Sequence, residues 1–154
     1  MLTEGEVRAL TVLHGEQTVS EFATQLDRSL SYTSELVERL ETTGLVETRR
    51  EGKTKQIRPS DAKALELLAD ITQAYSHIEW PELLSGSTLR VLYYLETPRV
   101  ATELARRADV HRSTVHRALG PLQHRGIIYE TDDGAYALNE GFEQLSTLAR
   151  ELAH

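Results

Sequence analysis

The chain of 154 residues contains no cysteine, one Trp and two Phe, and it has no long run of apolar residues. Without cysteine the protein can form neither disulfides nor thiolate metal sites, which suits the reducing cytoplasm. No segment approaches the roughly 18 consecutive apolar residues that a membrane-spanning helix needs. The N-terminal residues also lack the basic start and apolar block of a secretory signal. We therefore expect a cytoplasmic protein that does not contact a membrane.

Lysine is scarce in the sequence. Only Lys53, Lys55 and Lys63 stand among the 17 basic residues, and 24 acidic residues bring the formal net charge to −7. Lysine-poor, acidic surfaces are typical of proteins from high-salt cytoplasms, where net charge supports solubility. The composition therefore predicts a halophilic origin.

Sequence signatures of enzymes and metal sites are missing as well. The chain has neither the glycine-rich phosphate loop that ends in Gly-Lys nor the Gly-x-Ser-x-Gly turn of a serine hydrolase. His111 and His116 do not have the i, i+4 spacing that places two metal ligands on one helical face. We therefore expect a non-enzymatic protein with no catalytic residues, no bound metal and no cofactor.

The sequence repeats itself with an offset of 82 residues, which aligns Gly44 with Gly126. Apolar positions at helical spacing then coincide: Val7, Leu10 and Leu13 align with Leu89, Leu92 and Leu95, and Leu40 aligns with Leu122. A shared apolar pattern implies a shared packing scheme. The chain is therefore predicted to hold two copies of one small domain.

Each copy predicts three helices followed by a β-hairpin. The expected helices are 3–13, 19–26 and 30–42 in the first copy and 87–95, 101–108 and 112–124 in the second. Ser29 is a good N-cap for the third helix and His111 a weaker one, while Gly44 and Gly126 are suited to end these helices. Gly52 and Gly134 mark the hairpin turns. The fold class is mainly α with small β-hairpin wings (α+β), in the form of two tandem winged helix-turn-helix domains joined by a helix.

The predicted boundaries are 1–59 for the first domain, 60–80 for a connecting helix that begins near Ser60 and is stopped by Pro81, and 81–154 for the second domain with a C-terminal helix. Both additional helices are amphipathic. Their apolar stripes either pack back on their own domain or form an interface between subunits. The second alternative predicts a homodimer, since exposed stripes of this width would favour aggregation.

Two segments resemble known DNA-binding families. "SYTSELVERLETTGLVETRREGKTKQIRPS" resembles the third helix and wing of MarR-type transcriptional regulators. "HRSTVHRALGPLQHRGIIYETDDGAYALN" is similar to the DNA-binding domain of IclR-type regulators, above all in "STVHRAL", "RG" and "GAYAL". The tandem arrangement is most similar to prokaryotic, including archaeal, tandem winged-helix regulators. The resemblance implies binding of double-stranded DNA, with the third helix of a copy in the major groove.

The two copies differ in the groups that they offer to DNA. The candidate residues of the first copy are hydroxyls and one acid on the third helix, Ser31, Tyr32, Ser34 and Glu35, and a basic wing, Arg49, Arg50, Lys53, Lys55 and Arg58. The candidates of the second copy are Arg107 on the second helix and Arg112, Ser113, Thr114, His116 and Arg117 on the third. The wing of the second copy, "TDDG", is acidic and should avoid phosphate. A basic helix in one copy therefore complements a basic wing in the other.

One feature of the second copy departs from an ordinary recognition helix. Gly120 and Pro121 stand inside it, where the first copy has Glu38 and Arg39. An interior proline removes one helical hydrogen bond, so we expect a kink or a restart at this point.

The predicted function is a sequence-specific DNA-binding transcriptional regulator. The alternative is an acidic tandem winged-helix adaptor that binds other proteins, of the kind found in chromosome-segregation or ESCRT-type assemblies. The net charge favours the adaptor, whereas the basic wing and the basic helix favour DNA. Four aromatic residues, Tyr75, Trp80, Tyr93 and Tyr94, either line a pocket for an effector of unknown identity or pack in the core.

Overall fold

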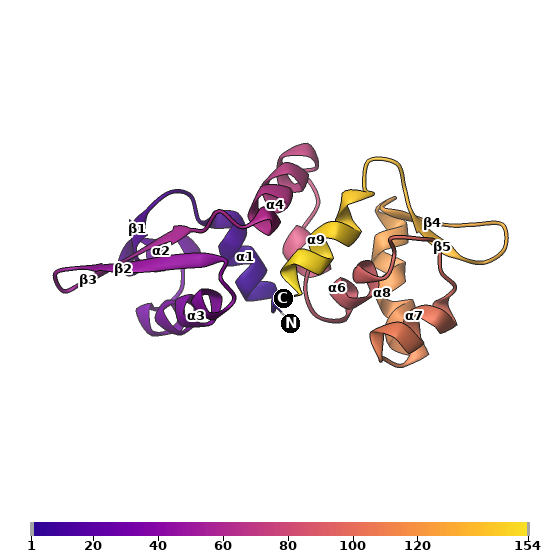
Figure 1. Cartoon of the computed structure of the whole chain (residues 1–154), viewed down its shortest axis with the longest axis horizontal. Helices are drawn as coiled ribbons and strands as arrows, with labels where there is room; N and C mark the ends of the chain where they lie inside the picture. Colours follow the sequence, from indigo (N-terminus) through magenta and orange to yellow (C-terminus); the bar gives the residue numbers. More distant parts are fainter. Residues whose placement is uncertain (1, 154) are drawn as a thin grey trace. The chain divides into compact units, whose positions relative to one another are not determined.

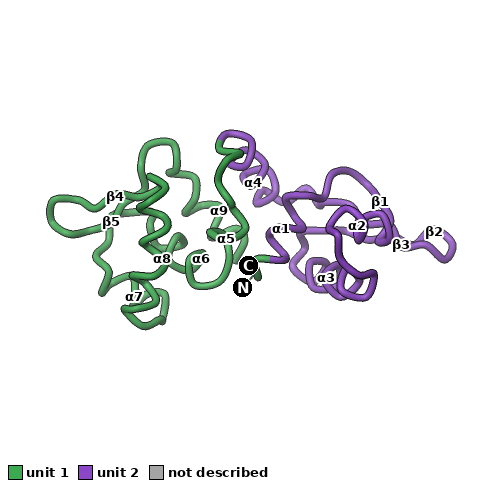
Figure 2. The backbone as a smooth tube through the Cα atoms, turned by 180° about the vertical axis from the view of Figure 1, so that it is seen from behind, with its two compact units in different colours: residues 1–4, 75–154 green, residues 5–74 purple. Residues whose placement is uncertain are grey.

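The computed structural model describes residues 2–153, which form two compact units (Figure 2). Unit 2 consists of residues 5–74. Unit 1 consists of residues 75–153 together with residues 2–4. The start of the chain belongs to unit 1 because Leu2 is buried and its carbonyl accepts a hydrogen bond from the N–H of Gly86 at 3.3 Å. Among the described residues, no helix is long and apolar enough to cross a membrane.

Unit 2 contains four helices and a three-stranded sheet within its described residues (Figure 1). In chain order its elements are α1 (Glu4–Val12), β1 (Gln17–Thr18), α2 (Val19–Leu26), α3 (Leu30–Thr42), β2 (Val46–Glu51), β3 (Thr54–Pro59) and α4 (Lys63–Ala74). The sheet order is β1-β3-β2, and all pairs are antiparallel. The tip of the β2–β3 hairpin projects beyond α2 and α3 in both views (Figures 1 and 2).

Local capping explains where the helices of unit 2 begin. Thr18 and Glu21 form a capping box at α2, in which each side chain accepts the backbone N–H of the other residue at 3.0 Å. Ser29 caps α3 by accepting the N–H of Tyr32 at 3.1 Å, as predicted. The apolar side chains that these helices turn inward, including Phe22, Leu36 and Leu40, are buried.

Unit 1 repeats this plan. Its elements are α5 (Trp80–Leu83), α6 (Gly86–Tyr93), α7 (Ala101–Ala108), α8 (Arg112–His124), β4 (Ile128–Glu130), β5 (Tyr136–Leu138) and α9 (Gln144–Leu152). Strands β4 and β5 pair antiparallel, and an isolated bridge joins Arg99 to Tyr136. The bridge lies where unit 2 pairs Gln17 with Ile57. The α+β fold class with winged helix-turn-helix elements is therefore confirmed.

The turn between the second and third helix has the same backbone in both units. Asp27 ends α2 and Asp109 ends α7, each with a φ of 55° in the left-handed region. Asp is one of the few residues other than Gly that tolerates this conformation. The predicted ranges of α2, α3, α7 and α8 are confirmed residue for residue, because the same local signals recur in both copies.

The connecting helix is shorter than predicted. It ends at Ala74 because the carbonyl of Tyr75 accepts hydrogen bonds from the N–H of Ile78 and from the indole N–H of Trp80, at 3.2 and 3.0 Å, which turns the chain. Pro81 does not stop this helix. It lies in the first turn of α5 instead, where a missing N–H costs nothing.

Helices α8 and α9 decide between alternatives that the sequence left open. Helix α8 continues through Pro121 to His124, so it does not restart there. The apolar stripe of α9 is not exposed, since Leu145, Leu148 and Leu152 are buried and the helix packs on α6 within unit 1. In α4, Leu68 and Ile71 are buried as well. The stripe of α9 therefore packs back on its own unit, which is the first of the two alternatives expected from the sequence.

The compact units do not coincide with the predicted domain limits. Residues 60–74 belong to unit 2 and residues 2–4 belong to unit 1. The limits at 59 and 81 stay predictions about independently folding segments, which limited proteolysis would test.

Candidate nucleic-acid interface

Helix α8 is positioned by its cap and by its buried face. The Nδ1 atom of His111 accepts the backbone N–H of Ser113 at 3.1 Å, so the imidazole caps the helix. Val115, Leu119 and Leu122 on the inner face are buried. The opposite face is therefore held toward solvent along the whole helix.

This outer face carries the predicted cationic and polar side chains together. Arg112, Ser113, His116 and Arg117 are exposed, and Thr114 is half-buried. Arg117 lies along the helix, with Nε donating to the carbonyl of Ser113 at 3.4 Å and Nη2 to the hydroxyl of Thr114 at 3.3 Å. Within residues 2–153, the guanidinium of Arg112 has no hydrogen-bond or ion-pair partner. Of the two arginines of this face, Arg112 is thus the one that is free to bind an added anion or base edge.

The basic residues of α7 are tied to a carboxylate that sequence reasoning missed. Glu103 receives Arg107 Nε at 3.0 Å and Arg99 Nη1 at 3.1 Å, and Arg106 Nη2 lies 3.7 Å away. The hydrogen bond from Arg107, together with the charges of the arginines, lowers the pKa of Glu103 below its usual value. Since Arg106 and Arg107 lie three and four residues after Glu103 in α7, helical spacing could have identified these two partners, but not Arg99, which precedes the helix. Arg107, a predicted DNA contact, is therefore already paired.

Arg99 is the structural centre of the same region. Its side chain is only 12% exposed, and its guanidinium also binds Glu96 at 2.6 Å and the carbonyl of Tyr94 at 2.7 Å. Its backbone bridges to Tyr136 of β5. Arg99 therefore fixes the loop before α7 to the wing of unit 1.

The wing of unit 2 has two faces that differ in charge pairing. Residues directly opposite in antiparallel strands share a face, so the register places Glu47, Arg49 and Glu51 of β2 with Arg58, Gln56 and Thr54 of β3 on the outer face. The inner face carries Val46, Thr48 and Arg50 with Pro59, Ile57 and Lys55. Val46 and Ile57 are buried, so the inner face is the one turned toward the core.

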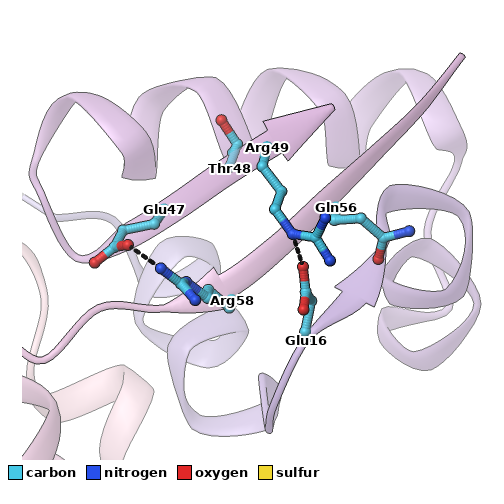
Figure 3. A pocket seen from close by; sticks show the side chains of 6 residues that line it. All are labelled: Glu16, Glu47, Thr48, Arg49, Gln56 and Arg58. Carbon is cyan, nitrogen blue, oxygen red and sulfur yellow. Dashed lines mark hydrogen bonds and ion pairs between the residues drawn. The ribbon is translucent and has the colours of Figure 1, made fainter. Parts of the chain in front are cut away.

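Cations on the outer face are neutralised by acids (Figure 3). Arg49 Nε donates to Glu16 Oε1 at 2.5 Å and Arg58 Nη2 to Glu47 Oε2 at 2.8 Å. The hydrogen bond from Arg49 lowers the pKa of the Glu16 carboxyl, and the pKa of Arg49 is raised in return. Arg49 and Arg58, both predicted DNA contacts, are thus satisfied within the protein.

The cations of the inner face and the hairpin tip are not neutralised. Arg50 lies directly opposite Lys55, and Lys53 stands in the turn between the strands. None of the three forms an ion pair with another residue in the described part of the chain. Like charges opposite each other in a sheet are unfavourable, so this pair would be relieved by an anion.

The third helix of unit 2 presents a different surface. Ser31, Ser34 and Glu35 are exposed, and Tyr32 is half-buried with the guanidinium carbon of Arg28 5.3 Å from its ring centroid. Glu38 and Glu41 extend the same face, and the hydroxyl of Thr48 donates to the Glu41 carboxylate. The predicted residues are therefore together, but the surface that they form is acidic.

The wing tip of unit 1 is acidic, with Asp132 and Asp133 exposed. The hydroxyl of Thr131 donates to Asp133 at 2.5 Å and lowers the pKa of its carboxyl. Across residues 2–153, no group of three or more His, Asp or Glu is arranged to hold a metal ion.

Residues 88–132, which run from α6 through β4, match the family model of the IclR helix-turn-helix domain. A search of curated proteins gives no significant match. The family match supports a DNA-binding transcription regulator with a winged helix-turn-helix. It gives no support to the alternative of a protein-binding adaptor.

Proposed function

We propose that the chain is a sequence-specific, double-stranded DNA-binding transcription regulator built from tandem winged helices. Helix α8 enters the major groove, and the basic wing of unit 2 contacts the phosphate backbone. One observation carries the proposal: the segment that matches a helix-turn-helix family contains an exposed, cationic third helix.

Arg112 is the principal base-reading residue in this proposal. A free guanidinium in the first turn of a recognition helix can bind the two acceptors of guanine in the major groove. Ser113, Thr114 and His116 supply further hydrogen bonds to bases or phosphates. Arg117 reaches the DNA after giving up its long hydrogen bonds to Ser113 and Thr114.

Unit 2 adds mainly sequence-independent affinity. Arg50, Lys53 and Lys55 contact phosphates, because they are the wing cations that lack an acidic partner among the described residues. The hydroxyls of Ser31, Tyr32 and Ser34 donate to the DNA, and the carboxylate of Glu35 accepts from a cytosine amino group. The resemblance of unit 2 to MarR-type regulators is part of the same proposal.

The test is a titration of labelled duplex DNA, followed by fluorescence anisotropy, after a binding site has been selected from random duplexes. We expect Arg112→Ala to weaken binding to the selected site by about 5- to 150-fold, the 1–3 kcal/mol of a bidentate base contact, with little change on mixed DNA. Arg90→Ala on α6 removes the same charge from the same unit and is the matched control. Equal losses for both variants, or no binding by the native protein, would overturn the proposal.

The proposal also covers the oligomeric state, the cellular setting and an effector. We retain a homodimer, a cytoplasmic and high-salt setting, and an effector of unknown identity as predictions. The apolar stripe of α9 does not support the dimer, since it is buried in unit 1. Trp80 is buried with its N–H bound to Tyr75, which favours a core role over a pocket. Light scattering at micromolar protein concentration would test the dimer.

A further inference from the structure

The middle of α8 contains the two residue types least favourable inside a helix. Gly120 and Pro121 follow each other there, and both are exposed. The helix nevertheless continues through them for its full length of 13 residues. The presence of two helix-destabilising residues at exposed positions of a continuous helix therefore calls for an explanation.

The packing of unit 1 does not supply that reason. Gly120 is not among the glycines with positive φ, and a Cβ added to it would meet nothing within 4 Å apart from its chain neighbours and the backbone of its own helix. Helix α3 has the same length and carries Glu38 and Arg39 at the corresponding positions. The scaffold therefore accepts ordinary side chains at this place.

Gly120 lies on the cationic face of α8. It stands one turn after His116 and two turns after Arg112, and Arg117 and His124 flank it at i−3 and i+4. Each of these four neighbours carries a long or aromatic side chain with donor groups. Gly120 therefore has no side chain among neighbours that carry hydrogen-bond donors. The main chain of the helix is exposed to solvent at this position.

We propose that Gly120 and Pro121 form the point of closest approach between α8 and the sugar–phosphate backbone of bound DNA. This inference rests on the proposed DNA-binding function. Glycine is the residue that lets a backbone come close to a ligand. Neither residue has a side-chain donor, so the contact is van der Waals packing against deoxyribose, and Arg117 and His124 bind the adjacent phosphates.

Proline itself offers a competing reason for the glycine. A Cβ on the residue before proline clashes with the proline ring in the helical region, so Gly120 could serve Pro121 alone. A variant that lacks Pro121 distinguishes between these two explanations for Gly120. In Pro121→Ala the clash is gone, and only a contact with DNA would still require glycine at position 120.

The experiment compares Pro121→Ala with Gly120→Ala/Pro121→Ala and Gly120→Leu/Pro121→Ala in the full chain. We expect the first double variant to melt about 2–8 °C above Pro121→Ala, since alanine stabilises a helix relative to glycine. Its affinity for a labelled duplex should nevertheless fall at least about tenfold, or about 1.4 kcal/mol, because the added Cβ keeps the helix from approaching the DNA as closely. The leucine variant should bind more weakly still. Both losses should be equal on the selected site and on mixed DNA, because the contact reads no base.

The outcomes separate this inference from the function on which it rests. A higher melting temperature with unchanged affinity in both double variants would overturn the close approach while leaving DNA binding intact. A loss confined to the selected site would also overturn it, because position 120 would then act on base reading. If Pro121→Ala and the native protein bind no duplex at all, the proposed function fails instead.

Discussion

Replacing Arg50 and Lys55 together by alanine should make DNA binding less sensitive to salt. These two side chains oppose each other on the inner face of the β2–β3 hairpin and have no acidic partner among the described residues. The control variant is Arg49→Ala/Arg58→Ala, which removes the same charge from the same two strands. Its side chains already bind Glu16 and Glu47, so DNA should depend on them much less.

The expected magnitude follows from counterion release. Each cation that neutralises one phosphate contributes about 0.9 to the slope of log affinity against log salt, so the Arg50/Lys55 variant should lose about 1.8. Between 50 and 200 mM salt the native protein should therefore lose about twelvefold more affinity than this variant. Removal of a like-charge pair should leave the fold intact, because such pairs do not stabilise a sheet.

Anisotropy titrations with a mixed-sequence duplex at three or more salt concentrations measure the slope directly. We expect the Arg49/Arg58 control to retain most of the native slope. If the control flattens the slope as much as the Arg50/Lys55 variant, the ion pairs of the outer face do not hold their arginines away from DNA. The division of the wing into two faces would then be wrong.

Three other substitutions test the fold that supports the interface. Ser29→Ala should lower the free energy of unfolding by about 1 kcal/mol, because α3 loses its N-cap, and Ser29→Asp should restore it; equal denaturant midpoints for the alanine variant and the native protein would contradict the cap. The pKa of Glu103 is lowered, so its stabilising contribution is present at neutral pH and is lost as the pH falls through that lowered value. Glu103→Gln should therefore flatten thermal stability between neutral and acidic pH, and an unchanged pH profile would contradict this. Phe142→Ala should cost about 3–5 kcal/mol in chemical denaturation, since Phe142 is buried and its ring centroid lies 4.4 Å from that of Tyr75; a loss well under 1 kcal/mol would refute that role.

The helix-turn-helix segments could be predicted from sequence because their signals are local. Ser29 acts on an N–H three residues away, and the apolar spacing appeared twice in one chain. Pro81 misled the prediction since proline is equally compatible with the end of one helix and the first turn of the next. Only the turn made by Tyr75 and Trp80 decides between these positions.

The candidate site could be predicted in composition but not in its charge pairing. Arg49 and Arg50 are neighbours in sequence, yet they point to opposite faces of β2. The acid that neutralises Arg49 is Glu16, which precedes it by 33 positions and is brought close by the pairing of β1 with β3. The order of charged residues along the sequence does not show which of the two arginines forms an ion pair. The register of the sheet determines it.

The position of Leu2 in unit 1 has a consequence for how the protein is made and cut. Unit 2 is inserted between two pieces of unit 1, because residues 2–4 belong with residues 75–153. During synthesis Leu2 is made before unit 2, whereas its hydrogen-bond partner Gly86 is made only after the whole of unit 2. Unit 2 can therefore complete its fold while unit 1 still lacks residues 75–153. A fragment that starts at Tyr75 would expose the surface that Leu2 covers. A large group fused directly before Leu2 would lie beside unit 1, although most of unit 1 is formed by residues 75–153.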